Sequence, residues 1–457
     1  MLCVFVEDLV ADGGRWVAGS GTTGWEDGAL VAGPERPADV GGRDGEEAIA
    51  WLVAPGLALI AVTYGLARFA YGLFLPDMRE AFDLSPSLLG LIGAGSYLGY
   101  CVAVIISLVY TSRTGPRLMA VGAGAVAVAG MAVVAGSPVA WVLALGILVA
   151  GSSTGLVSPP MAEAVARSIG HSLQDRANTL INSGTSVGVA LSGPAALLLT
   201  GQWRVAWTMF ALVGLAVLAW NAAVMPRKAL QDRDEDESGE PDEDGAEAGN
   251  GSGRTRLSFS YLIGARVRPR SLPLFAVAFG VGFASAVYWT FSRELVVQAG
   301  GLGQTGSTLF WTVIGISGLA GGAAGDLVGR LGLTTVLRGG LVSMAASMVL
   351  LTVASSVLPL AYTSAALFGS TYIMLTGVIL VWSVGVFRER PAAGLGAGFL
   401  LIAAGQMIGS PIAGALAGTA SPTIAFFSFA VAAVLTACVN PHPEDTGASA
   451  SVVDTPP

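Results

Sequence analysis

Charged side chains are scarce in this sequence. Only 12% of its 457 residues are Asp, Glu, Lys or Arg, whereas 53% are apolar. A soluble protein carries about 25% charged residues, so this chain has too few charges for an ordinary soluble surface. Its 63 glycines point the same way, because glycine is more frequent in membrane helices than in soluble ones. The composition favours a protein embedded in lipid.

Cysteine and histidine are also rare. Cys3, Cys101 and Cys438 are far apart, with neither the spacing of metal ligands nor that of a disulfide framework. His171 and His442 fall in an expected loop and an expected tail. An enzyme needs acids, bases, nucleophiles or metal ligands that converge, and the apolar segments contain no such set. We therefore expect no enzyme, no metal and no cofactor.

The acids are unevenly distributed. Most of the 31 Asp and Glu lie in residues 1–50, 226–271 and 441–457. These segments have no sustained apolar period, so we expect 1–50 and 441–457 to be disordered tails and 226–271 to be a flexible acidic linker. Residues 1–50 also lack a basic region followed by an apolar core, which argues against a cleaved signal peptide. The net charge of −8 thus belongs to tails and linker, and no nucleic-acid partner is expected.

Between these segments lie apolar runs bounded by charge, proline or glycine. Each has about the 20 residues that a helix needs to cross roughly 30 Å of hydrocarbon. They predict an all-α membrane protein with twelve transmembrane helices, in two six-helix halves at 51–225 and 272–440. The twelve runs are 51–76, 86–110, 118–136, 138–162, 177–200, 205–225, 272–292, 305–325, 334–357, 359–386, 393–418 and 422–439.

One charge lies deep inside these runs. Arg338 is close to the start of its run and can extend to the interface. Arg68 is eight residues short of Pro76, which is roughly 12 Å along a helix. A charge at that depth costs about 2.5–3.5 kcal/mol on insertion scales and marks a functional site by default. Arg68 therefore either binds a substrate or forms a structural or gating pair.

The basic residues predict the orientation in the membrane. If the N-terminus is cytoplasmic, the outer loops hold only Arg79, Arg204 and Arg293, and nearly all other Lys and Arg of the helical region and linker fall on the inner side. Because cytoplasmic loops carry the excess of Lys and Arg, we expect both termini and the 226–271 linker to be cytoplasmic.

The two halves resemble each other in sequence. In the first helix, Tyr71 is followed by Phe74 and then by an acid, Asp77; in the seventh, Tyr288 is followed at the same spacing by Phe291 and Glu294. Gly-x5-Pro recurs in the fifth and eleventh helices, from Gly188 to Pro194 and from Gly405 to Pro411. Matches in the same order at equivalent helices indicate duplication, which is typical of transporters with a site at the midplane between their halves.

The loops after the second and eighth helices carry a motif of the form G-x3-D-R-x-G-R. The second copy, GLAGGAAGDLVGRLG, includes Asp326, Arg330 and Gly332, whereas the first, SLVYTSRTGPR, keeps Arg113 and Arg117 but has Ser112 in place of the acid. In these motifs the chain resembles the major facilitator superfamily (MFS) over about 51–440. The resemblance implies a cytoplasmic gate at Arg113, Arg117, Asp326 and Arg330. The missing acid puts a full charge lock of the first half in doubt.

Two further resemblances are narrower. The segment RFAYGLFLPDM, residues 68–78, resembles the first helix of the YbfB/YjiJ-like subgroup, which does not imply one substrate. The fifth helix, GTSVGVALSGP, resembles the glycine-rich motif of exporting antiporters. The alternative there is helix packing and a bend, since small residues let helices approach closely. The residues concerned are Gly188, Gly193, Pro194, Gly405, Gly409 and Pro411.

The MFS resemblance implies a central cavity lined by the first, fourth, seventh and tenth helices with their partners. Tyr64, Arg68 and Tyr71 share one face of the first helix, at i, i+4 and i+7. The other candidate substrate-binding residues are Asn182, Tyr288, Tyr372 and Gln406. Each polar side chain has the alternative of a hydrogen bond between helices. The acids available for proton coupling lie at the ends of the predicted helices: Asp77, Glu163 and Glu294.

These features predict a secondary active transporter of the plasma or inner membrane, acting as a monomer on a small organic solute by alternating access. Arg68 suggests an anionic solute, and protons are a further candidate partner. One alternative is a proton-antiport efflux pump for toxic amphiphilic compounds. An alternative of another class is a membrane sensor that does not transport.

Overall fold

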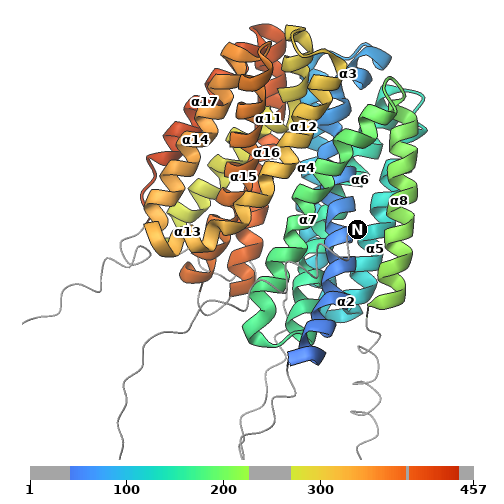
Figure 1. The fold of residues 1–457 in the computed structure, drawn as a ribbon, viewed down its shortest axis with the longest axis vertical. Helices are drawn as coiled ribbons and strands as arrows, with labels where there is room; N and C mark the ends of the chain where they lie inside the picture. The colour runs from blue at the N-terminus through green and yellow to red at the C-terminus, as the bar shows by residue number, and fades with distance from the viewer. Residues whose placement is uncertain (1–41, 226–268, 388–390, 442–457) are drawn as a thin grey trace, which may run out of the picture.

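The structure is a computed structural model that describes residues 42–225, 269–387 and 391–441. Both tails and most of the predicted linker lie outside these residues. The described chain is a bundle of long helices, and the two halves stand side by side with their axes roughly along the same direction (Figure 1).

The N-terminal half has six membrane-crossing helices. Its first helix is continuous but changes type twice, and it begins at Gly42 rather than at the expected Trp51. The elements are α2 (Gly42–Ile60), η2 (Ala61–Phe69), α3 (Ala70–Phe82), α4 (Pro86–Thr114), α5 (Pro116–Ala135), α6 (Ala140–Ser168), α7 (His171–Leu198) and α8 (Trp203–Val224).

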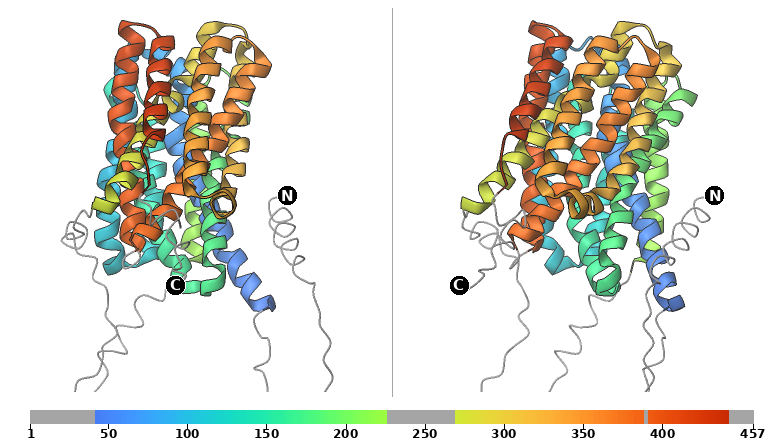
Figure 2. Two further views of the ribbon diagram at one scale, coloured as in Figure 1. Left: turned by 90° about the vertical axis from the view of Figure 1, so that its left-hand side faces the viewer. Right: turned by 60° about the vertical axis from the view of Figure 1, so that its left-hand side comes forward.

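The C-terminal half repeats this plan. The eighth membrane helix of the chain belongs to this half, and a 3-10 segment interrupts it. After this segment, α13 (Ala324–Leu331) lies across the end of the bundle (Figure 2). The elements are η3 (Pro269–Ser271), α11 (Leu272–Ala299), α12 (Gly303–Gly318), η4 (Leu319–Ala323), α13 (Ala324–Leu331), α14 (Leu333–Ala354), α15 (Leu358–Val386), α16 (Pro391–Thr419) and α17 (Pro422–Ala437).

Within the described residues, ten helices are long and apolar enough to cross a membrane. The more polar α7 and the shorter α17 complete the predicted twelve. The surfaces of these helices carry large exposed apolar side chains such as Trp141, Leu198 and Leu435. In water such a surface would be costly, whereas in lipid it is what a multi-pass protein presents. The all-α, twelve-helix membrane fold is therefore confirmed.

The duplication is visible in the backbone. The loop after α4 turns at Gly115 with φ 81° and ψ 156°, and the loop after α13 turns at Gly332 with φ 80° and ψ 151°. Only glycine adopts a positive φ of this kind readily. A glycine with the same backbone conformation therefore directly precedes the third and the ninth membrane helix.

In the described residues, the halves are joined mainly by three pairs of helices: α4 with α16, α7 with α12, and α3 with α11. Glycines let their backbones meet. A Cβ added at Gly72 would lie 2.0 Å from the carbonyl oxygen of Trp289, and one added at Gly90 would lie 2.4 Å from that of Ser410. Since real Cβ atoms do not approach that closely, these positions require glycine for the halves to close.

Candidate functional site

Arg68 lies in the last turn of η2, a nine-residue π-helix in the middle of the first helix. The amide of Ala70 there donates to the carbonyl of Gly65, one residue further back than in an α-helix. Short π segments inside α-helices occur frequently at functional sites. This one carries the deep arginine, whose side chain is only 6% exposed.

Arg68 contacts the other half of the protein. Its Nη2 donates to Oε1 of Gln406 on α16 at 2.9 Å. Gln406 Nε2 in turn donates to the hydroxyl of Tyr372 on α15 at 3.2 Å and to that of Ser285 on α11 at 3.3 Å. One hydrogen-bonded cluster therefore joins the first helix of one half to three helices of the other.

Aromatic rings surround the guanidinium. Its Cζ atom lies 4.6 Å from the ring centroid of Tyr100, 4.8 Å from Tyr97, 5.3 Å from Phe69 and 5.7 Å from Tyr64. Cations within about 6 Å of a ring face are attracted to it, the more so when desolvated. Among the described residues no carboxylate pairs with Arg68. The protein thus stabilises this buried charge by rings and one amide oxygen.

A small cavity lies beside Arg68 at the seam between the halves. Its volume is ≈ 10 Å³, close to the least space that one water molecule needs. The lining includes Phe69 and Tyr71 from the first helix, Ser96 and Tyr97 from α4, and Trp289 from α11. The halves are therefore closed around the centre, and a solute of any size requires them to separate.

The other predicted tyrosines differ in position. The Tyr64 hydroxyl is 2.7 Å from the Ser158 hydroxyl on α6, and Tyr71 lines the cavity while donating to the Leu89 carbonyl at 2.8 Å. Tyr288 is fully buried away from Arg68, where it stacks on Phe368 with centroids 3.8 Å apart.

Asn182 is likewise not brought to the Arg68 cluster. It is exposed on α7 and donates to the Asn178 carbonyl of its own helix at 2.9 Å. The structure thus gathers Tyr64, Tyr71, Tyr372 and Gln406 around Arg68, and leaves Tyr288 and Asn182 outside.

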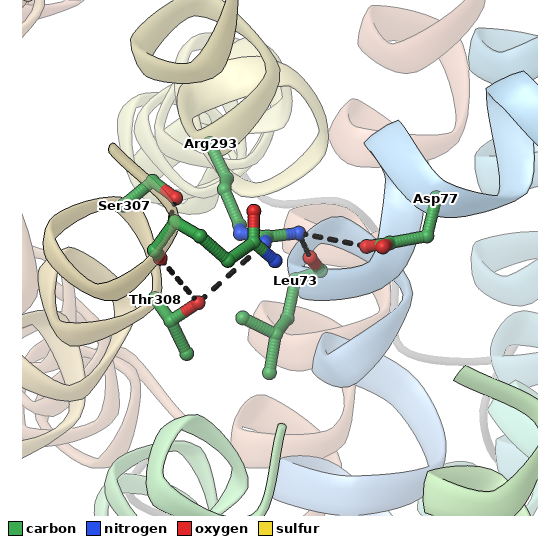
Figure 3. A network of polar contacts seen from close by, with 6 residues as sticks. Leu73, Asp77, Arg293, Ser307 and Thr308 are labelled. Carbon is green, nitrogen blue, oxygen red and sulfur yellow. Dashed lines mark hydrogen bonds and ion pairs between the residues drawn. The ribbon is translucent and has the colours of Figure 1, made fainter. Parts of the chain in front are cut away.

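Two ion pairs cross between the halves at the end of the bundle farther from α13. Arg293 on α11 donates to Asp77 on α3 at 3.1 Å, and also to the Leu73 carbonyl and to Thr308 Oγ1 (Figure 3). In the second ion pair the arginine and the acid exchange halves: Arg79 on α3 pairs with Glu294 on α11. Each half therefore gives one acid and one arginine to this set, which is named the outer ion-pair set after the predicted orientation of the chain: Asp77, Arg79, Arg293 and Glu294.

A comparison with known families identifies the fold. The profile of the family described as "Major Facilitator Superfamily" matches residues 57–402, well over half of the chain. The chain belongs to the major facilitator superfamily. Its members are transporters rather than enzymes, so secondary transport is the function class that the family supplies.

Solved MFS structures agree with this fold. A mutant of the nucleoside transporter NupG has a TM-score of 0.66 at 10% identity, and the match covers 84% of this chain and 98% of that one. The xylose transporter XylE from E. coli, in a partially occluded inward-open conformation, has a TM-score of 0.65 at 14% identity, with 86% and 96% covered. No curated protein matches in sequence. The YbfB/YjiJ-like resemblance stays a prediction.

The residues expected to form the MFS cytoplasmic gate lie at the end of α4, at the start of α5 and on α13. Asp326 and Arg330 are both exposed on α13, and neither takes part in an ion pair with another described residue. Arg113 is exposed at the end of α4, and Arg117 donates to the Ala222 carbonyl on α8, within the same half. The gate therefore stays a prediction.

The expected packing glycines lie where neighbouring helices approach closely. A Cβ at Gly188 would lie 2.2 Å from the Ala61 carbonyl oxygen, and one at Gly193 would lie 2.1 Å from Thr312 Oγ1 on the other half. On α16, a Cβ at Gly405 would lie 2.2 Å from the Phe279 oxygen, and one at Gly409 2.8 Å from that of Phe283. The two prolines, Pro194 and Pro411, lie inside α7 and α16. Helix packing stays the predicted role of this motif.

Sequence reasoning did not find Ser96, Tyr97, Tyr100 or Trp289. The α4 residues carry a detectable signal, since Tyr100 lies one turn from both Ser96 (i, i+4) and Tyr97 (i, i+3). Trp289 has no such signal, because an aromatic residue in an apolar run is ordinarily a lipid-facing or core residue.

Proposed function

We propose that this MFS protein is a secondary active transporter of a small organic solute that carries an anionic group. The two halves, 51–225 and 272–440, would alternate access around Arg68. The observation that carries the proposal is the buried guanidinium at the seam, which has rings and an amide oxygen around it but no carboxylate partner among the described residues.

The energetics favour an anionic cargo. A buried charge is tolerated when it is paired and hydrogen-bonded, and cation–π contacts recover only part of what water supplies. The Gln406 amide oxygen is neutral, so it satisfies one N–H group without balancing the charge. A cargo with an oxyanion would supply both an acceptor and the missing counter-charge.

The competing interpretation of Arg68 is a structural pair, in which its bond to Gln406 only locks the halves together. A thermal-shift screen of the purified protein against a metabolite library separates the two, because a ligand stabilises the form that it binds. We expect anionic solutes to stabilise the parent protein, Arg68→Lys to bind them more weakly, and Arg68→Ala to lose the response. Equal responses in all three proteins would remove Arg68 from the binding site.

We place the protein in the plasma or inner membrane as a monomer with both termini cytoplasmic. The support is the distribution of Lys and Arg in the sequence, since nearly all of those in the helical region and linker fall in segments predicted to be cytoplasmic. Proton coupling belongs to the proposal as well. All three candidate acids are paired with arginines: Asp77 with Arg293, Glu294 with Arg79, and Glu163 with Arg167. Protonating one of these acids would break its ion pair and release the arginine.

A further inference from the structure

Three residues that line the central cavity each carry a buried polar atom without a partner in hydrogen-bonding geometry among the described residues. These atoms are Arg68 Nε, Ser96 Oγ and Trp289 Nε1. All three residues line the same cavity and are at least nine-tenths buried, at 6%, 3% and 4% exposure. A buried polar group without a partner is rare and calls for an explanation.

The chemistry of these atoms defines what is missing. Arg Nε–H and Trp Nε1–H only donate, and a serine hydroxyl donates as readily as it accepts. The complementary group must therefore offer several acceptor sites within a small space. A carboxylate does so with two oxygens and about four lone-pair sites, and its bonds to these donors would be charge-assisted.

Charge balance limits the anion to a single charge. The cavity contains one unbalanced cation, since the four charges of the outer ion-pair set neutralise one another. A monoanion would neutralise the site, whereas a dianion would leave a net charge in apolar surroundings, which is costly. Phosphate and dicarboxylate groups therefore fit this site less well than one carboxylate.

The rest of the lining indicates the body of the ligand. Phe69 stacks on Trp289 with centroids 4.1 Å apart and an interplanar angle of 24°, and Tyr97 completes the aromatic wall. Gly72 and Gly93 also line the cavity. A Cβ added at Gly72 would meet the Trp289 carbonyl oxygen, and one added at Gly93 would meet the Ser410 hydroxyl. Rings of this kind bind flat or apolar groups.

We propose that Arg68, Ser96 and Trp289 form an anion subsite for the carboxylate of a monocarboxylate whose remaining part is aromatic or apolar. This inference rests on the proposed function and names its substrate class. Arg68 and Ser96 belong to the N-terminal half and Trp289 to the C-terminal half, so a bound carboxylate bridges the seam. The cargo would thereby favour closure of the two halves around it.

The test uses the purified full chain and isothermal titration with three probes: benzoate, its neutral isostere benzamide, and the dianion phthalate. The parent should bind benzoate at least about tenfold more tightly than either other probe, the effect of one charge-assisted interaction. Trp289→Phe, which keeps a ring and loses the N–H, and Ser96→Ala should each weaken benzoate about tenfold.

Matched controls exist in the chain. Trp207 Nε1 and Ser292 Oγ are also buried without a partner, but neither residue lines the cavity. Trp207→Phe and Ser292→Ala should therefore bind benzoate as the parent does. If they weaken binding as much as Trp289→Phe and Ser96→Ala, the effect is a general loss of packing and the subsite is overturned.

The remaining outcomes separate this inference from the proposed function. Loss of benzoate binding in Arg68→Ala, with parent-like binding in Trp289→Phe and Ser96→Ala, overturns the subsite and leaves the proposed function standing. Parent-like binding in Arg68→Ala, or equal affinity for benzoate and benzamide, overturns both. If the parent binds phthalate as tightly as benzoate, or does not bind benzoate, the assignment to monocarboxylates with apolar bodies is overturned.

Discussion

At the scale of single residues, the central feature is how Arg68 is accommodated. Four rings and one amide oxygen surround a positively charged side chain. Gln406 occupies the position where an acid would make a permanent ion pair. Because a neutral amide leaves the charge unbalanced, we expect Arg68 to bind an anion from outside the protein.

Replacing Gln406 by glutamate tests this arrangement. Gln406→Glu would put a carboxylate at the position that now accepts from Arg68 at 2.9 Å. The resulting internal ion pair would compete with the cargo, so we expect anionic ligands to bind at least about tenfold more weakly. The measurement is titration calorimetry with the ligands found in the thermal-shift screen.

Gln304→Glu is the control, because it adds the same charge at an exposed position on α12. It should bind these ligands like the parent. If Gln406→Glu binds them with undiminished affinity, Arg68 does not hold their anionic group.

At the scale of elements, the predictions from sequence succeed where apolar length decides the structure. The twelve runs predict the helices, since 20 apolar residues have few alternatives in lipid. The first helix starts earlier than expected, at Gly42, because composition alone does not show that a charged flank extends a helix. The π segment around Arg68 was not predictable, since apolar periodicity does not distinguish the hydrogen-bond pattern of a π-helix from that of an α-helix.

The site was partly predictable for the same reason. Arg68 stands out in sequence because its charge is unusual at that depth, and Gln406 and Tyr372 are polar residues in apolar runs. The cross-half partners of Asp77 and Glu294 were not predictable, because arginines and acids at helix ends are ordinary in sequence. Only the close approach of α3 and α11 brings Asp77 to Arg293 and Arg79 to Glu294.

The outer ion-pair set makes a prediction for these two elements. We expect the double variant Asp77→Asn, Glu294→Gln to open the outer end of the seam more often, because both cross-half pairs are lost. In a background with Cys3, Cys101 and Cys438 changed to serine, an added Thr290→Cys reports access to the cavity. Its labelling by a membrane-impermeant maleimide from outside should rise about fivefold, corresponding to about 1 kcal/mol for partly exposed pairs.

The swapped pair Arg79→Glu, Glu294→Arg serves as the control for this experiment. The swap reverses one ion pair without removing it. The labelling rate of this variant should therefore stay near that of the protein in which Asp77 and Glu294 are unchanged. An unchanged labelling rate in the neutralised double variant would show that these ion pairs do not hold the outer end closed.

At the scale of the whole molecule, the two halves touch mainly along three helix pairs and enclose a centre with room for about one water. Glycines at the seam, such as Gly72 and Gly90, make this closure possible. The charged groups that bridge the seam are arranged at two levels: the ion pairs at one end and Arg68 with Gln406 at the centre. Separation of the halves must break at least one of these levels.

The most direct test of the central claim is carboxylate exchange by the protein reconstituted in liposomes. Labelled benzoate outside should enter vesicles preloaded with unlabelled benzoate in the presence of the parent protein. The exchange rate should fall severalfold in Arg68→Lys and at least about tenfold in Arg68→Ala, in proportion to the lost ion pairing. Exchange by Arg68→Ala at the rate of the parent would contradict the claim that Arg68 holds the anionic group of the cargo.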